Sequence, residues 1–73
     1  MSQVAVIGEE TRIQSFALAG VATHPAETDE ETRLAWRSLS ADVSVVILTP
    51  LAADRLAGQL QQRPEVLTVV MPP

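Results

Sequence analysis

The segment that most constrains the fold is an uninterrupted, mostly apolar run over residues 43–48, followed by Thr49 and Pro50. Most of its side chains are β-branched, and a short continuous run of this kind is typical of a strand buried on both faces of a parallel sheet. Thr49 is a suitable N-cap, and Pro50 suits the first position of a helix. We therefore predict a central strand that passes directly into a helix.

Strand and helix patterns alternate along the rest of the chain. A capping-box pattern of Thr28 and Glu31 marks the start of one helix, and Gly20 is a suitable stop signal for the helix before it. Pro25 ends a short strand and favours a sheet edge. The predicted strands cover residues 3–8, 21–24, 43–48 and 66–71, and the predicted helices cover residues 9–18, 29–39 and 50–62.

Alternation of strands with helices predicts parallel pairing and right-handed crossovers. The second strand is short and ends in His24 and Pro25, so we place it at an edge. The resulting prediction is an α/β fold of the flavodoxin-like or Rossmann-like class. It is a four-stranded parallel sheet in the order 2-1-3-4 with three helices, forming one small domain over residues 1–73.

Composition excludes several classes of protein. There is no cysteine, so disulfides and thiolate metal sites are not available. The net charge is −4 and all five basic residues are arginines scattered along the chain, which does not suit nucleic-acid binding. No apolar run has the length of a membrane helix, and the N-terminus has no signal-peptide pattern. We expect a cytoplasmic protein without direct membrane insertion.

Patterns that would indicate catalysis are incomplete. Glu9 and Glu10 follow the first strand, but no Asp ends the third strand and the chain has no Lys, which argues against a phosphoacceptor receiver. Gly8 has no second glycine in its loop, which argues against a dinucleotide site. His24 has no partner near it in sequence, and Trp36 has the spacing of a core residue. We expect no catalytic residue, metal or cofactor.

One face of the predicted sheet is expected to lack a covering helix. The first helix lies on one face, the other two lie on the opposite face, and the chain ends at Pro73 without a further helix. An exposed apolar face of this kind is typical of a partner surface, with self-association as the alternative. The exposed residues are expected to be either Val43, Val45 and Ile47 or Ser44, Val46 and Leu48, with the matching half of residues 66–71.

Two motifs carry a resemblance to a known family. Val6-Ile7-Gly8 is followed by an acidic residue, Glu9, and the run Phe16-Ala17-Leu18-Ala19-Gly20-Val21 comes after it. The chain resembles the F subunit of the archaeal (A-type) and vacuolar-type (V-type) ATP synthases and ATPases, whose signature has Gly-Phe-basic-Leu-Ala-Gly-Val. Ser15 and Ala17 replace the Gly and the basic residue of that signature. Asp42-Val43, Ile47-Leu48-Thr49 and Val69-Val70-Met71-Pro72 also match the family's later strands.

This resemblance implies a non-catalytic rotor component of the central stalk in a proton- or sodium-translocating complex. Its partners would be the coiled coil of the D subunit and the catalytic A/B headpiece, and its location would be cytoplasmic and peripheral to the membrane. Family members commonly continue into a C-terminal helix that contacts the headpiece. The sequence ends at Pro73, so we expect that helical tail to be absent.

The partner-binding residues follow from the exposed face and the signature together. Packing of the first helix on the sheet is an alternative explanation for Phe16 and Leu18. The alternative function is a small-ligand or nucleotide sensor that binds at the carboxyl ends of strands one and three, lined by Glu9, Glu10 and Thr49. The predicted partner-binding set is Val45, Ile47, Leu67, Val69, Phe16 and Leu18.

Overall fold

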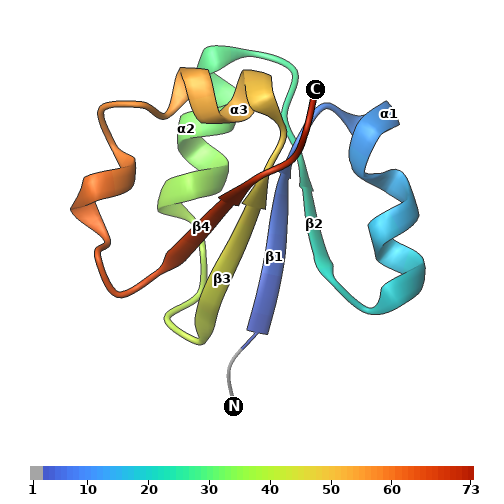
Figure 1. The fold of residues 1–73 in the computed structure, drawn as a ribbon, viewed down its shortest axis with the longest axis horizontal. Helices are drawn as coiled ribbons and strands as arrows, with labels where there is room; N and C mark the ends of the chain where they lie inside the picture. The colour runs from blue at the N-terminus through green and yellow to red at the C-terminus, as the bar shows by residue number, and fades with distance from the viewer. Residues whose placement is uncertain (1–2) are drawn as a thin grey trace.

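A computed structural model describes residues 3–73 as one parallel sheet with helices on both of its faces (Figure 1). Strands and helices alternate from β1 to β4, and two 3-10 helices, η1 and η2, follow the helices α1 and α3. The elements are β1 (Gln3–Gly8), α1 (Glu10–Ile13), η1 (Gln14–Ala19), β2 (Ala22–Pro25), α2 (Asp29–Arg37), β3 (Val43–Leu48), α3 (Pro50–Arg55), η2 (Leu60–Gln62) and β4 (Leu67–Val70).

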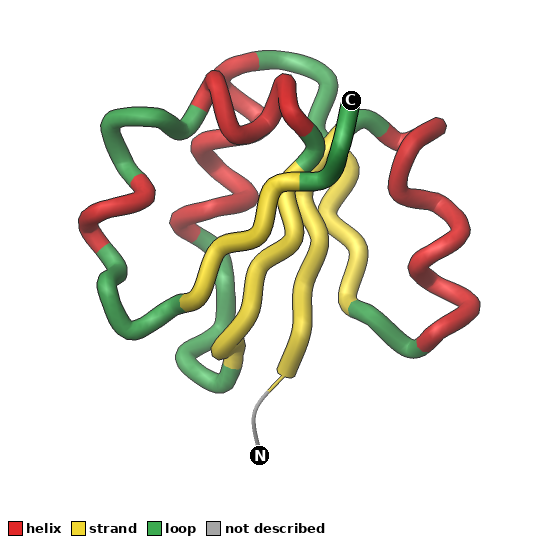
Figure 2. The backbone as a smooth tube through the Cα atoms, in the orientation of Figure 1, coloured by secondary structure: helices red, strands yellow, loops and turns green. Residues whose placement is uncertain are grey.

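The sheet has the strand order β2-β1-β3-β4 with every pair parallel, which confirms the predicted flavodoxin-like arrangement. Figure 2 shows the four strands side by side, with β2 and β4 at the two edges. Pro25 closes the edge strand β2, where a residue without an N–H does not interrupt a ladder. The apolar run of β3 lies at the centre, between β1 and β4.

The main core lies between the sheet and the helices α2 and α3. Trp36 of α2 and Leu56, which caps α3, are almost fully buried against β1 and β3. Thr28 caps α2 by accepting a hydrogen bond from the Glu31 N–H at 3.0 Å, and Thr49 caps α3 in the same way from the Ala52 N–H at 3.3 Å. Both predicted N-caps are therefore confirmed, as is the core position of Trp36.

The opposite face of the sheet is covered only in part. Val6 points away from the main core and is fully buried, as is Ile13 of α1, so α1 covers this end of the face. Figure 1 shows α1 and η1 beside β2, far from β4. No helix among residues 3–73 covers the part of this face that β3 and β4 form.

A β-bulge changes the face to which Val43 belongs. Gln3 pairs with Val43 while the next residue, Val4, pairs with Val45, so Ser44 is an extra residue on β3. Side chains alternate with a period of two, and one extra residue therefore puts Val43 on the same face as Val46. Val43 is 6% exposed and packs in the main core, so placing it in an exposed set with Val45 and Ile47 was wrong.

Two of the predicted helices are only in part α-helical. The predicted helix over residues 9–18 is a single α turn, Glu10–Ile13, continued by the 3-10 helix Gln14–Ala19. The predicted helix over residues 50–62 ends as an α-helix at Arg55, and a separate 3-10 turn covers Leu60–Gln62. Ala57, which lies between these two elements, is exposed.

Candidate functional site

The candidate site is the uncovered part of the sheet, which we call the apolar face. Val45 pairs with Leu67 and Ile47 pairs with Val69, so these four side chains project to the same side, together with Val4 of β1. Leu67 is 62% exposed, Val69 is 45% exposed and Val4 is 38% exposed, while Val45 and Ile47 are half-buried. The apolar face consists of Val4, Val45, Ile47, Leu67 and Val69.

The structure brings together four of the six predicted partner-binding residues and separates the other two. Phe16 and Leu18 lie on η1, which packs beside β2 on the other side of β1 from β3 and β4. Phe16 is half-buried, as expected for a residue that packs on the sheet. Leu18 is 93% exposed, so packing on the sheet does not explain it.

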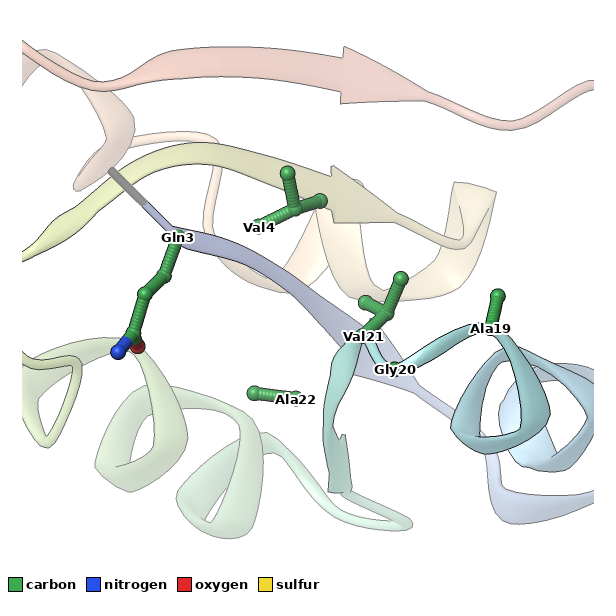
Figure 3. Close-up of a pocket in the computed structure, with 6 residues that line it drawn as sticks. All are labelled: Gln3, Val4, Ala19, Gly20, Val21 and Ala22. Atoms are coloured by element: carbon green, nitrogen blue, oxygen red, sulfur yellow. The ribbon is translucent and has the colours of Figure 1, made fainter. Parts of the chain in front are cut away.

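A hollow adjoins the apolar face at the amino-terminal ends of β1 and β2. Its volume is about 490 Å³, and Figure 3 shows the side chains of Val4, Ala19 and Val21 projecting to the same side of it. Val4 belongs to both the hollow and the apolar face. The residues that line the hollow are Gln3, Val4, Ala19, Gly20, Val21 and Ala22.

The polar groups at the carboxyl ends of β1 and β3 are paired with one another. The Thr49 hydroxyl donates a hydrogen bond of 2.5 Å to the Glu9 carboxylate, and this bond is the main reason that the pKa of Glu9 is lowered from its ordinary value. The Glu10 N–H donates to Glu27 at 2.9 Å. Glu9, Glu10 and Thr49, which were predicted to line a small-ligand site in the alternative function, thus take part in interactions that order the β1–α1 and β3–α3 connections.

Gly8 allows these two connections to approach each other closely. A Cβ atom at this position would overlap Cγ2 of Thr49, at a separation that two non-bonded carbon atoms cannot adopt. The absence of a side chain at Gly8 therefore permits the contact between Thr49 and Glu9. The single glycine of this loop has a packing role in the structure.

His24 lies at a second hollow, away from the apolar face. It is half-buried near Leu34 in a space of about 310 Å³ between β2 and α2. Within residues 3–73, no group of three or more His, Asp and Glu side chains is placed to hold a metal ion. None of the helices in this part of the chain has the length and hydrophobicity needed to cross a bilayer.

Comparison with known families connects the fold to a group of proteins. The sequence profile of the ATP synthase (F/14-kDa) subunit matches residues 4–72, which is nearly the whole chain. The chain belongs to this family. The crystal structure of the F subunit of the V-type ATP synthase from Archaeoglobus fulgidus is similar to it, with 25% sequence identity and a TM-score of 0.60. The similarity covers 93% of this chain and 96% of that one. No curated protein matches the chain by sequence.

Sequence reasoning missed two parts of the site in this member of the ATP synthase F subunit family. Val4 was not placed on the apolar face, although its alternation with the buried Ala5 gives it the same orientation as Val6. The hollow was also missed, because its walls come from a strand end and a turn that are far apart in sequence. The signal available in the sequence was the run of small residues from Ala19 to Ala22.

Proposed function

We propose that this chain is a non-catalytic rotor component of a V/A-type ATP synthase or ATPase and that its apolar face docks on the coiled coil of the D subunit. The observation that carries the proposal is the set of five apolar side chains on β1, β3 and β4 that no helix of residues 3–73 covers. Membership of the ATP synthase F subunit family supports the kind of complex. In this proposal, ATP turnover takes place in the A and B subunits.

The dimensions of the apolar face suit a helix. Neighbouring strands are about 4.8 Å apart, so the three strands β1, β3 and β4 together span about 10 Å, close to the diameter of an α-helix. The exposed parts of the five side chains, largest at Leu67, Val69 and Val4, amount to roughly 300 Å² of apolar surface, a size that often marks interaction sites on soluble domains. A helix from the coiled coil would occupy the position that a fourth covering helix would take.

The role that follows is mechanical. A protein docked on the central stalk turns with it and contributes to coupling between ATP turnover and the transport of protons or sodium ions. The complex would hold the chain at the cytoplasmic side of the membrane. The net charge of −4 and the apolar face together favour recognition of another protein of the complex over contact with an anionic lipid surface.

Val69 and Val70 offer a matched pair for testing the docking face. They are neighbours on the edge strand β4 and are 45% and 52% exposed, but their side chains project to opposite faces of the sheet. Val69→Glu places a charge on the apolar face, and Val70→Glu places the same charge on the other face. Binding of each variant to a D-subunit coiled coil from the same source is measured by calorimetric titration, after circular dichroism has shown that both variants fold.

We expect Val69→Glu to weaken binding about a hundredfold, since an interfacial charge without a partner costs several kcal/mol, whereas Val70→Glu binds within about threefold of the wild type. Equal loss in both variants would place the contact at the edge of β4 instead of the apolar face. No binding by the folded wild-type chain would refute the docking proposal.

A further inference from the structure

We infer that the hollow beside the apolar face is an anchor site, in which the helix docked on that face inserts one bulky apolar side chain. This inference rests on the proposed function and extends the contact from the strands to the turn between η1 and β2. The anchor site consists of the residues that line the hollow, from Gln3 and Val4 on β1 to Ala19–Ala22.

The hollow exists because β1 and β2 diverge at their amino-terminal ends. The two strands pair only from Ala5 and Ala22 onward. Gly20 precedes β2 with φ of 78°, a left-handed conformation that ends η1 and turns the chain toward the sheet. The diverging ends leave an open space of about 490 Å³ whose wall includes Val4, a residue of the apolar face (Figure 3). Gln3 and Ala22 line the hollow from the opposite face of the sheet, and a helix that covers Val4 lies beside the wall that Val4 forms.

The side chains that line the hollow favour an apolar side chain as its occupant. Sites for small molecules combine an apolar lining with several convergent polar groups that fix orientation. Here Gln3 supplies the one polar side chain among the six lining residues, and the others are valine, alanine and glycine. Ala19, Gly20 and Ala22 are small, so the space next to them is available to a large side chain from outside. Such buried anchors carry much of the binding energy of an interface.

The structure favours a helix from a different protein over a second copy of this chain. The apolar face offers roughly 300 Å², while stable homodimers bury about 800 Å² or more on each partner. Each copy also carries a net charge of −4, which opposes self-association. A single helix can lay its apolar stripe along the three strands, and insertion of a side chain into the hollow supplies the anchor that a small flat face lacks.

Ala19 and Ala17 provide a matched pair for testing this site. Both are exposed residues of η1, but only Ala19 lines the hollow. Ala19→Trp fills the hollow from within, and Ala17→Trp adds the same bulk to the same helix outside it. Ala19→Leu is a smaller filling substitution in case the indole disturbs folding, which circular dichroism would reveal. The chain carrying each substitution is titrated with the D-subunit coiled coil, beside the wild type and Val69→Glu.

We expect Ala19→Trp to weaken binding about tenfold or more, Ala19→Leu to have a smaller effect, and Ala17→Trp to bind as the wild type does. If the Ala19 variants bind normally while Val69→Glu does not, the proposed docking function stands and the anchor site is refuted. Equal loss in Ala17→Trp and Ala19→Trp would also refute insertion into the hollow. Failure of the wild type to bind would refute both proposals. Sedimentation experiments would also show whether the wild type forms a dimer. If it does and Ala19→Trp dissociates that dimer, a second copy fills the hollow and this inference is refuted.

Discussion

Val45 and Val46 are adjacent on the central strand, and the structure predicts very different costs for truncating them. Val46 is fully buried in the main core, between the sheet and the helices α2 and α3. Val45 projects to the apolar face and is half-buried. We predict that Val46→Ala destabilises the domain strongly and that Val45→Ala does so only weakly, although the two substitutions remove the same atoms from the same strand.

The magnitudes follow from the burial of the two side chains. Truncating a buried valine removes two methyl groups worth about 0.8 kcal/mol each, and the cavity left behind adds to this, so Val46→Ala should cost about 2–3 kcal/mol. Val45 is partly in contact with solvent in the isolated chain and leaves no closed cavity, so its truncation should cost about 0.5–1 kcal/mol. The difference of about 1.5–2 kcal/mol corresponds to a factor of at least ten in the unfolding equilibrium.

Urea denaturation followed by fluorescence measures this difference directly. Trp36 is the single tryptophan and lies in the main core, where it is 1% exposed, so its emission reports loss of the native packing. Equal m-values in the two variants would show that the same surface is exposed on unfolding. Equal free energies of unfolding for Val45→Ala and Val46→Ala, or a larger cost for Val45→Ala, would refute the assignment of the two faces.

Three further predictions concern the connections around the sheet. Gly8→Ala would drive a Cβ atom into Cγ2 of Thr49, so we expect a loss of about 1–3 kcal/mol in chemical denaturation, and wild-type stability would contradict this close approach. The Thr49 hydroxyl lowers the pKa of Glu9 from 4.5, so the bonded carboxylate stabilises the fold above that pH and its contribution is lost as the pH falls through the lower folded value. Glu9→Gln should therefore lose less stability than the wild type on acidification below pH 4.5. Identical pH profiles of the free energy of unfolding for the two proteins would contradict a stabilising role of the Glu9 carboxylate. Arg63 lies 5.8 Å from the Trp36 ring centroid and donates to the carbonyls of Arg37, the last residue of α2, and Leu39, so Arg63→Met should cost about 1 kcal/mol in thermal unfolding. An unchanged midpoint would show that these contacts contribute nothing.

The strands and their order were predictable because strong signals determine them. The continuous apolar run before Thr49 and Pro50 does not suit an exposed strand or loop, so it indicates a buried strand. Strand–helix alternation then leaves few topologies for a four-stranded sheet. Pro25 identified one edge of the sheet correctly. Both N-caps were also predictable, since Thr28 and Thr49 act on backbone groups within three residues of themselves.

The first helix was mispredicted because its apolar spacing has two explanations. Ile13 and Phe16 are three residues apart, which suits an α-helix and also a 3-10 helix, where residues three apart lie in line. Ala17, four residues after Ile13, would have supported the α-helix, but it is exposed. Only one row of side chains therefore packs on the sheet, and the tighter 3-10 geometry over Gln14–Ala19 satisfies that row.

The composition of the apolar face depends on a feature that sequence patterns do not reveal, the bulge at Ser44. Alternation alone puts Val43 beside Val45 and Ile47, and this would extend the apolar face along β3 toward its amino-terminal end. The extra residue instead turns Val43 into the main core, where it is 6% exposed, and confines the apolar face to the part of β3 that pairs with β4. The smaller face suits a single docked helix better than it suits self-association, because its area falls well short of the area that stable homodimers bury. The bulge thus links a local irregularity of the backbone to the kind of partner that the domain can accept.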